Sequence, residues 1–544
     1  MTSHFPRAFH RSADTQLFRR QYSHFSPPLS FGSQGQHGTD TTRDQKAMDY
    51  TEKLSDDSLC YIFWYSITST FVLPPIFGDS RLRLMAVSRR WRRIILRSTN
   101  FWDTTVIIPS SPVLTPGLAK IAEKWLKIHW KNDHILSVFL LQPRHLADVN
   151  RPGSREHNQI FRVVEDGILP AARSTKSFSC TLGTKEGIES FFAIPPGIFC
   201  CLEKLELSVP MLPDKELARH AIKTTIEQGL HRFTAFQRLP RLRSAVITIK
   251  IGINPLAFRI PWRQLTKLDM MNTTLSPHIF LQVISSPALS LKDGSFTIQF
   301  KRIIRSNSLA SKNIFRIAKL RFLQNLRLRL IDPTLDTRIF SRIHLTTLCH
   351  LRIDLVQDLD KAGWTISIYQ KLLSKSRDTM KSLMFWDAPF RGYENNEMGG
   401  PTLVYSPPCS RNDLDGLFSM LPKLEHLHLP IGIYIPQNAA DKIARGILLP
   451  SLRILDVSST FGVDILDIVE RRNELAYYRA GCVGSSKLEN GSARTDIYPP
   501  FFSHVLLLTS SNYRSQVELA KRYLHSSSNS QGTVLDIRYV GFPQ

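Results

Sequence analysis

The sequence predicts an α+β chain of several domains, with a small all-α module near the N-terminus and a long α/β solenoid after it. Three observations lead to this prediction. The chain has 544 residues, which is long for one compact domain. Two helix-like amphipathic segments lie between residues 54 and 102. From about residue 170 a short apolar pattern recurs many times, which is typical of repeat architectures.

The composition is that of a folded, basic protein. Hydrophobic residues make up 42% of the chain and aromatic residues 10%, which is enough for a packed core. The net charge of +24 favours acidic partners or nucleic acid, although many proteins this basic simply have a solvated surface. The seven cysteines are scattered and contain no C-x-x-C pair. The sequence therefore indicates neither a disulfide framework nor a zinc site.

Residues 1–50 are predicted to be a disordered basic tail, because Ser, His, Gln, Gly and Arg dominate them. The segment Phe18–Ser23 is similar to the processing site of a mitochondrial transit segment, so mitochondrial targeting is an alternative. No signal peptide is indicated, and the expected location is the cytoplasm, the nucleus or both. An uncharged run from Ser58 to Gly78 is long enough for a membrane span. Several hydroxyl residues and Pro74-Pro75 interrupt it, so no membrane association is expected.

The stretch from Leu54 to Trp102 predicts two or three short helices. In its first part apolar residues recur at the spacing of one helical face: Leu59, Ile62, Phe63 and Ile67. Ser55 and the two acids after it suit the start of this helix. A second apolar stripe follows: Leu84, Val87, Trp91, Ile94 and Ile95. Seven arginines between Arg81 and Arg97 are expected to form mostly a solvated face. Such short helices must bury their apolar faces against each other or against a partner.

These segments resemble the F-box found in an expanded family of mushroom-type (agaricomycete) fungal proteins. In that family an L-P-x-E-x-L-x-x-I-F helix is followed by V-C-R-R-W-R-x-I-A and then by T-P-x-L-W. The matching residues are Leu54, Asp57, Leu59, Ile62, Phe63, Val87, Arg89, Arg90, Trp91, Arg92, Ile94, Thr99 and Trp102. The chain departs from the family at Ser55, Ser88 and Asn100-Phe101. The alternative interpretation is an ordinary pair of core helices without a partner.

The resemblance implies a substrate-receptor subunit of an SCF-type cullin-RING ubiquitin ligase. Residues 51–106 would then be the F-box, which binds a SKP-type adaptor and through it a cullin. Such a subunit is not an enzyme, because it only holds a protein target near the ubiquitin-charged enzyme. The residues expected to form the F-box, some facing the adaptor and some facing the module's own core, are Leu54, Leu59, Ile62, Phe63, Val87, Trp91 and Trp102.

Residues 107–169 are predicted to be a connecting helix–strand region. Leu118–Leu126 has a helical apolar pattern, and Ile135–Leu141 is typical of a buried strand. Trp125-Leu126 followed by Leu136-Ser137-Val138 is also similar to the W-L-x-R-S-x-x-x-P-L-x-L segment of the same fungal family.

Residues 170–480 are predicted to form an irregular leucine-rich-repeat solenoid. The pattern L-x-x-L-x-L begins at Leu202, Leu265, Leu323, Leu348, Leu424 and Leu452, with weaker copies at Leu242, Leu291 and Met380. From Leu265 onward the copies start 25 to 44 residues apart, near the period of leucine-rich repeats. Each copy predicts a strand, and helical patterns such as Ile366–Leu373 lie between copies. Pro261–Leu268 also resembles the family's P-W-x-x-L-T-x-L repeat. The alternative is an α/β domain with leucine-rich strands but no solenoid.

Residues 481–544 are predicted to contain a polar loop and a C-terminal cap. A helix is expected from Gln516 to Leu524 and a strand from about Val534 to Val540. Their expected role is to shield the last repeat from water.

The sequence contains no motif typical of catalysis, cofactor binding or metal binding. Strand side chains alternate between the two faces of a sheet, so polar residues between the leucines should share one exposed face. The candidate target-binding residues on it are Lys204, Lys267, Arg327, Arg329, Arg352 and His428. A basic face of this kind suits an acidic or phosphorylated protein target. The alternative function is a nucleic-acid- or chromatin-associated scaffold with a vestigial F-box.

Overall fold

The computed structural model describes residues 50–67, 70–72, 79–98, 101, 105–109, 136–141, 172–182, 194–209, 220, 223–224, 227–229, 234–250, 253–286, 290–300, 317–331, 337–356, 364, 366–387, 413–430, 433–459, 462–482, 499–526 and 533–540. The chain consists of two units, Met1–Ser55 and Asp56–Gln544. The first contains the 3-10 helix η1 (Tyr50–Lys53). The tail 1–49, the predicted helix Leu118–Leu126 and most of the polar loop after residue 481 lie outside the described residues.

The second unit begins with three short helices, α2 (Asp56–Ser66), α3 (Ser80–Val87) and α4 (Arg89–Arg97). Asp56 and Asp57 in the first turn of α2 complement the positive end of the helix dipole. α3 and α4 are separate helices because Ser88 has an extended backbone and its hydroxyl accepts the N–H of Trp91 at 3.1 Å. Their shared core consists of Leu59, Phe63, Met85, Ile94, Ile95 and Phe101.

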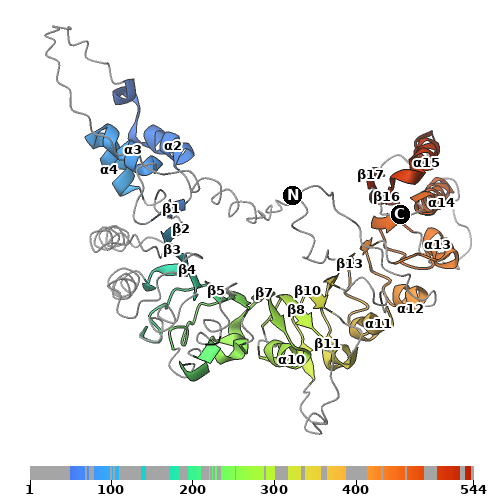
Figure 1. Cartoon of the computed structure of the whole chain (residues 1–544). Helices are drawn as coiled ribbons and strands as arrows, with labels where there is room; N and C mark the ends of the chain where they lie inside the picture. The colour runs from blue at the N-terminus through green and yellow to red at the C-terminus, as the bar shows by residue number, and fades with distance from the viewer. Residues whose placement is uncertain are drawn as a thin grey trace, which may run out of the picture. The chain divides into compact units, whose positions relative to one another are not determined.

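The rest of the unit is built on a 15-stranded sheet whose strands pair in chain order and are all parallel (Figure 1). Its strands are β1 (Thr70–Val72), β2 (Thr105–Pro109), β3 (Leu136–Leu141), β4 (Thr175–Thr181), β5 (Lys204–Val209), β6 (Ser244–Ile249), β7 (Lys267–Leu275), β8 (Asp293–Gln299), β10 (Asn325–Ile331), β12 (His350–Val356), β13 (Ser382–Asp387), β14 (His426–Leu429), β15 (Ile454–Ser459), β16 (His504–Ser510) and β17 (Val534–Val540). The short strands β9 (Ala318–Leu320) and β11 (Ile343–Leu345) form a separate pair. The predicted mixed α/β character is confirmed.

All nine copies of the leucine pattern coincide with strands, from β5 to β15. Equivalent positions are neighbours in the register, as in the pairs Leu326↔Leu351 and Leu328↔Ile353. The sheet also extends beyond residues 170–480, to β1 at one end and β17 at the other. The same pattern recurs at β4 and β16 with other buried residues at its three positions. These are Thr175, Phe178 and Cys180 at β4, and Phe502, Val505 and Leu507 at β16. A search for leucine alone could not find these two copies.

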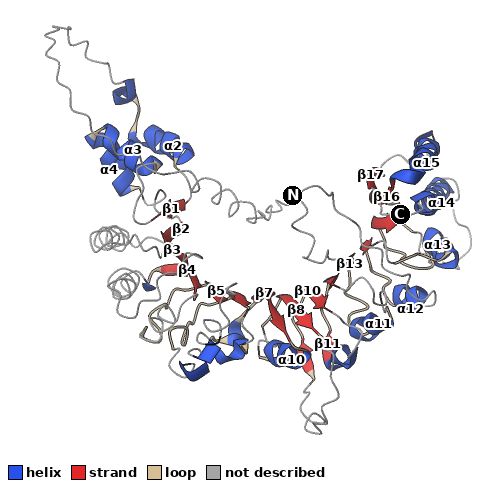
Figure 2. Cartoon of the chain, viewed as in Figure 1, coloured by secondary structure: helices blue, strands red, loops and turns tan. Residues whose placement is uncertain are grey.

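Six α-helices in the described part of the chain lie on one face of the sheet (Figure 2). They are α10 (Pro277–Ser285), α11 (Ser367–Leu373), α12 (Asp413–Ser419), α13 (Gln437–Ala444), α14 (Gly462–Cys482) and α15 (Arg514–Ser526). The predicted helix Ile366–Leu373 is α11, and the predicted C-terminal helix and strand are α15 and β17.

The pattern leucines point toward these helices and form the core. No described helix covers the opposite face, which we call the helix-free face; it carries the strand residues that alternate with the leucines.

Candidate recognition surfaces

α2 is apolar on almost every side, although only one side is packed. Leu59 and Phe63 are buried. The remaining sides form what we call the α2 surface, whose members are 66, 47, 55 and 73% exposed: Tyr61, Ile62, Trp64 and Tyr65. Solvated helices normally present polar residues to water. A contiguous exposed group of four large apolar side chains is instead typical of a protein-binding site.

The α2 surface rests on a fixed support. The ring of Phe63 lies 4.7 Å from that of Trp91 and 6.3 Å from that of Phe101, centroid to centroid. Arg90 of α4 donates to Asp56 of α2, with 2.7 Å between Nη2 and Oδ1. On the surface itself, the hydroxyls of Tyr61 and Tyr65 lie 2.9 Å apart and their rings meet edge to face. These contacts hold α2 in place and keep the rings of Tyr61 and Tyr65 together on its surface.

The predicted F-box residues therefore divide into two groups. Leu59 and Phe63 are in the core, and Trp91 is half-buried against them. Leu54, Ile62 and Val87 are exposed. Trp102 lies outside the described residues. Leu59, Ile62 and Phe63 were predicted to share one helical face. Ile62 lies at the exposed edge of that face, because the contact with α4 covers a narrow arc that Ile62 flanks.

The structure also shows where Val87 and Arg81 lie. The break at Ser88 ends α3 at Val87, so Val87 does not continue into the buried stripe of α4. Arg81, expected on a solvated face, is completely buried. It donates to the Asp79 carboxylate (3.0 Å from Nη1) and to the carbonyl of Phe101 (2.9 Å from Nε). Burial lowers the pKa of Arg81, and the charge of Asp79 opposes this shift.

The six candidate target-binding residues all lie on the helix-free face, at positions that alternate with the pattern leucines. Lys204 and Lys267 are exposed at the starts of β5 and β7. The other four lie farther along the sheet: Arg327 and Arg329 on β10, Arg352 on β12 and His428 on β14. They differ in access, because the arginines are half-buried and His428 is only 4% exposed.

Asp354 of β12 organises the arginines. Its carboxylate is buried, with 2% of the side chain exposed, and accepts from guanidinium groups on two strands. Arg327 donates to Oδ2 from Nε and Nη2 at 2.9 and 2.7 Å, and Arg352 donates to Oδ1 from Nε at 2.7 Å. Arg329 stands directly opposite Asp354 in the register of β10 and β12. We call these four residues the arginine cluster.

An aromatic stack adjoins the arginine cluster. The guanidinium carbon of Arg352 lies 4.5 Å from the ring centroid of Trp386 on β13. The ring of His428 stacks on Trp386 with centroids 3.9 Å apart and an interplanar angle of 10°. Arg352 and His428 come from the strands on either side of β13, so they cover the two faces of the indole. This arrangement fixes the orientation of the Arg352 guanidinium.

Asp456 of β15 completes the row of polar side chains. His426 Nε2 donates to its carboxylate at 2.8 Å, and Nδ1 of His428 is 3.9 Å away, beyond hydrogen-bond distance. Burial alone would raise the pKa of Asp456. The hydrogen bond from His426 and the proximity of His428 outweigh it and hold the pKa well below its ordinary value of 3.8.

This pKa shift predicts an acid-sensitive contribution to stability. Because the folded-state pKa is depressed, Asp456 stabilises the fold fully above pH 3.8 and progressively less as the pH falls below it. Asp456→Asn should therefore lower the free energy of unfolding more at pH 7 than at pH 3. Urea unfolding of both proteins at the two pH values measures this difference. An equal effect of the substitution at both pH values would contradict the prediction.

A hollow of about 190 Å³ lies on the helix-free face beside the arginine cluster. It spans four adjacent strands, β8 to β13, and is about the size of one side chain. Its polar lining includes Asp293, Asn325, His350, Arg327 and Arg352. One aspartate and two arginines therefore line the same hollow, and the register of the strands brings them together.

Sequence reasoning missed two residues of this region, Asp354 and Trp386, whereas the strand alternation had already assigned Asp456 to this face. Each lies at a strand position that alternates with the pattern leucines, next to candidates that were found. The signal was present for Asp354, since Arg352 and Asp354 are two residues apart and side chains at that spacing share a face. Trp386 gave no such signal, because it belongs to one of the weaker copies of the leucine pattern, the copy that begins at Met380.

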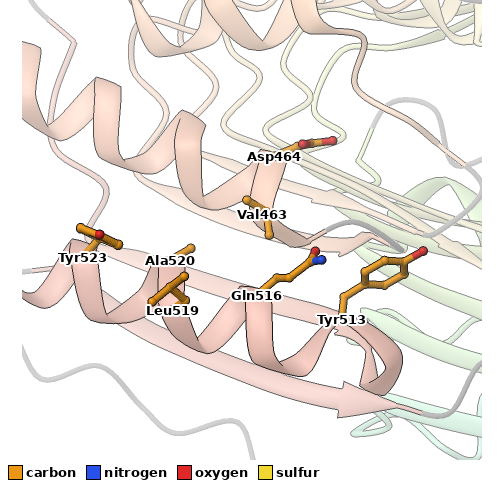
Figure 3. Close-up of a pocket in the computed structure, with 7 residues that line it drawn as sticks. All are labelled: Val463, Asp464, Tyr513, Gln516, Leu519, Ala520 and Tyr523. Atoms are coloured by element: carbon orange, nitrogen blue, oxygen red, sulfur yellow. The ribbon is translucent and has the colours of Figure 1, made fainter.

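A groove of about 570 Å³ lies between α14 and α15 (Figure 3). It is lined mainly by apolar groups, including Val463, Tyr513, Leu519 and Tyr523. Burial, and then the charge of Asp467, raise the pKa of Asp464 at its edge. Leu519 and Tyr523 are exposed and lie on a helix other than α2, which makes them useful control positions.

The residues that the structure describes contain no group of three or more His, Cys, Asp or Glu side chains arranged to hold a metal ion. None of their helices combines the length and the apolar character needed to cross a membrane. Comparison of the chain with protein-family models and with curated proteins found no match.

Proposed function

We propose that this protein is a substrate receptor of an SCF-type ubiquitin ligase. In this proposal the helices α2 to α4 are an F-box that binds a SKP-type adaptor, and the parallel sheet with its helices is an irregular leucine-rich-repeat solenoid. The helix-free face would bind the protein target. The protein would contribute no bond chemistry and would act by raising the local concentration of the target.

The α2 surface is the observation on which the proposal rests. Four large apolar side chains are exposed on one short helix while its opposite side is fully packed. The hydrophobic effect favours covering such a surface, and aromatic residues are enriched where protein partners meet. The F-box resemblance supplies the partner, a SKP-type adaptor.

The order of the strands supports the second half of the proposal. Each strand pairs with the strands before and after it in the sheet, with equivalent pattern positions in register. Repeat proteins have this architecture and use their extended open surfaces for binding. The helix-free face offers such a surface, with charged and aromatic groups on neighbouring strands.

Adaptor binding tests the proposal. We expect the full chain to bind a purified SKP-type adaptor, and Ile62→Asp or Tyr65→Asp to weaken binding by about thirtyfold or more, as at other interface hot spots. Both positions are exposed, so the variants should remain folded. Tyr523→Asp is the matched control, because it places the same charge at an exposed aromatic position on α15. Isothermal titration calorimetry measures the affinities.

Two results would count against the receptor proposal. One is a folded wild-type chain that does not bind the adaptor. The other is adaptor binding that Ile62→Asp and Tyr65→Asp leave unchanged. Salt-dependent binding to nucleic acid in the absence of adaptor binding would instead favour the scaffold alternative.

A further inference from the structure

The arginine cluster has more positive than negative groups at one place in the sheet. Arg327 and Arg352 share the single carboxylate of Asp354, and Arg329 stands opposite Asp354 in the strand register. That carboxylate is buried, whereas the side chains of Arg327 and Arg352 are 37 and 35% exposed. The negative charge therefore lies at the base of the cluster, and the positive groups extend toward solvent.

The two exposed guanidinium groups keep hydrogen-bond donors available. Arg327 uses Nε and Nη2 for Asp354, and Arg352 uses only Nε. Among the described residues, Nη1 of Arg327 and both Nη atoms of Arg352 have no hydrogen-bond acceptor. A guanidinium group presents its donors in a planar fork that matches the oxygens of a carboxylate or a phosphate.

The cluster is also held in position before any ligand arrives. Asp354 orients both guanidinium groups, and the stack on Trp386 fixes that of Arg352. Within the described part of the chain, two further polar groups at the stack have no hydrogen-bond partner: the indole N–H of Trp386 and Nδ1 of His428, which lies 3.9 Å from the carboxylate of Asp456. His428 is more than nine-tenths buried. Preorganised donors lose little conformational freedom when a ligand binds.

We propose that the arginine cluster is a binding site for a single anionic group, a carboxylate or a phosphate, carried by an extended peptide segment of a protein partner. This site deepens the proposed function. Only the identification of the partner as a ubiquitination target rests on that function. The adjoining hollow would take the neighbouring side chain of the segment. Because Asp293 lines the hollow, we expect that neighbouring side chain to be uncharged or basic.

The same geometry disfavours nucleic acid as the ligand. Single-stranded nucleic acid binds proteins largely by stacking its bases on exposed aromatic faces. Arg352 and His428 already cover the two faces of Trp386. A base would have to displace one of them.

Peptide binding to the full chain, without adaptor, tests the proposal. The probes are short fluorescent peptides that are identical except for one position, which holds phosphoserine, glutamate or serine. In about 0.15 M salt, where long-range attraction is screened, we expect the anionic peptides to bind at least about tenfold more tightly than the serine peptide. The stronger of the two anionic probes identifies phosphate or carboxylate as the preferred group.

Variants separate a defined site from general basic charge. Arg327→Gln and Arg352→Gln should each weaken binding of the anionic peptide by about tenfold. Lys371→Gln in α11 and Lys375→Gln just after it remove the same charge from exposed positions away from the helix-free face, and should change binding by less than about twofold. Arg352→Lys keeps the charge but loses the planar fork, and should still weaken binding by about threefold. Thermal melting of each variant confirms that it is folded.

Three outcomes would overturn the proposal. The anionic and serine peptides could bind equally, the lysine variants could lose as much affinity as the arginine variants, or a single-stranded oligonucleotide could bind more tightly than either anionic peptide. Since the assay contains no adaptor, its result is independent of the adaptor titration. A chain that binds the adaptor but not the peptides would refute this site alone.

Discussion

Replacing Arg472 with methionine should lower the local free energy of unfolding at the C-terminal end of the sheet by about 3–5 kcal/mol. Arg472 lies on α14 and is completely buried. Within the described part of the chain it has no carboxylate partner. Its guanidinium group instead donates to five backbone carbonyls, those of Ile443, Leu449, Pro450, Leu452 and Pro500.

The size of this effect follows from what the substitution leaves behind. Methionine would fill much of the space but could not donate, so several buried carbonyls would lose their hydrogen bonds. The carbonyl of Ile443 lies in the last turn of α13, and the other four lie in the segments that lead into β15 and β16. Burial lowers the pKa of Arg472 only to about 10, so the guanidinium group remains charged at neutral pH. The substitution therefore also removes the cation–π contact of this group with the ring of Phe502.

In a long sheet each strand contacts only the strands beside it, so a substitution changes stability mainly near its own position. Hydrogen exchange of the β15 and β16 amides therefore measures the effect directly. Arg471→Met is the matched control. Arg471 is 46% exposed and forms ion pairs with Asp441 and Asp467, so its loss should cost less than about 1 kcal/mol. Equal losses of protection in the two variants would show that the buried network contributes no special stability.

The second large effect concerns the helical module. Phe63→Ala should destabilise it by about 3–5 kcal/mol, because Phe63 is fully buried and removing its ring leaves a cavity between Trp91 and Phe101. Tyr65→Ala, two residues later on the same helix, should change stability by no more than about 0.5 kcal/mol because Tyr65 is exposed. Hydrogen exchange of the α2 and α4 amides reports both changes.

These two substitutions also make the adaptor experiment interpretable. Phe63→Ala should lose adaptor binding together with the helical module, whereas Tyr65→Ala should lose binding with the module intact. A Phe63→Ala protein with normal protection in α2 and α4 would contradict the packing described above. It would also remove the reason for assigning Leu59 and Phe63 to the core and Ile62 to the surface.

The sequence alone was sufficient to predict most of the strands from β5 to β15. Three apolar positions at fixed spacing define one face of a short strand, and strands that repeat the same spacing can pair in register. For this reason Leu326 and Leu351 could be assigned to equivalent positions before their pairing was known. The helix α11 and the C-terminal pair α15 and β17 were predicted for the same reason, since a local apolar period determines each of them.

Only the tertiary structure could decide which side chains meet. The alternation along a strand assigns Arg327, Arg352 and Asp354 to one face, but their ion pairs depend on which strand lies beside which and in what register. Similarly, the helical period of α2 allows several buried arcs, and the position of α4 selects the one that contains Leu59 and Phe63. Local periodicity arises from the geometry of one segment, whereas contacts between segments far apart in sequence arise from the packing of the whole sheet and core.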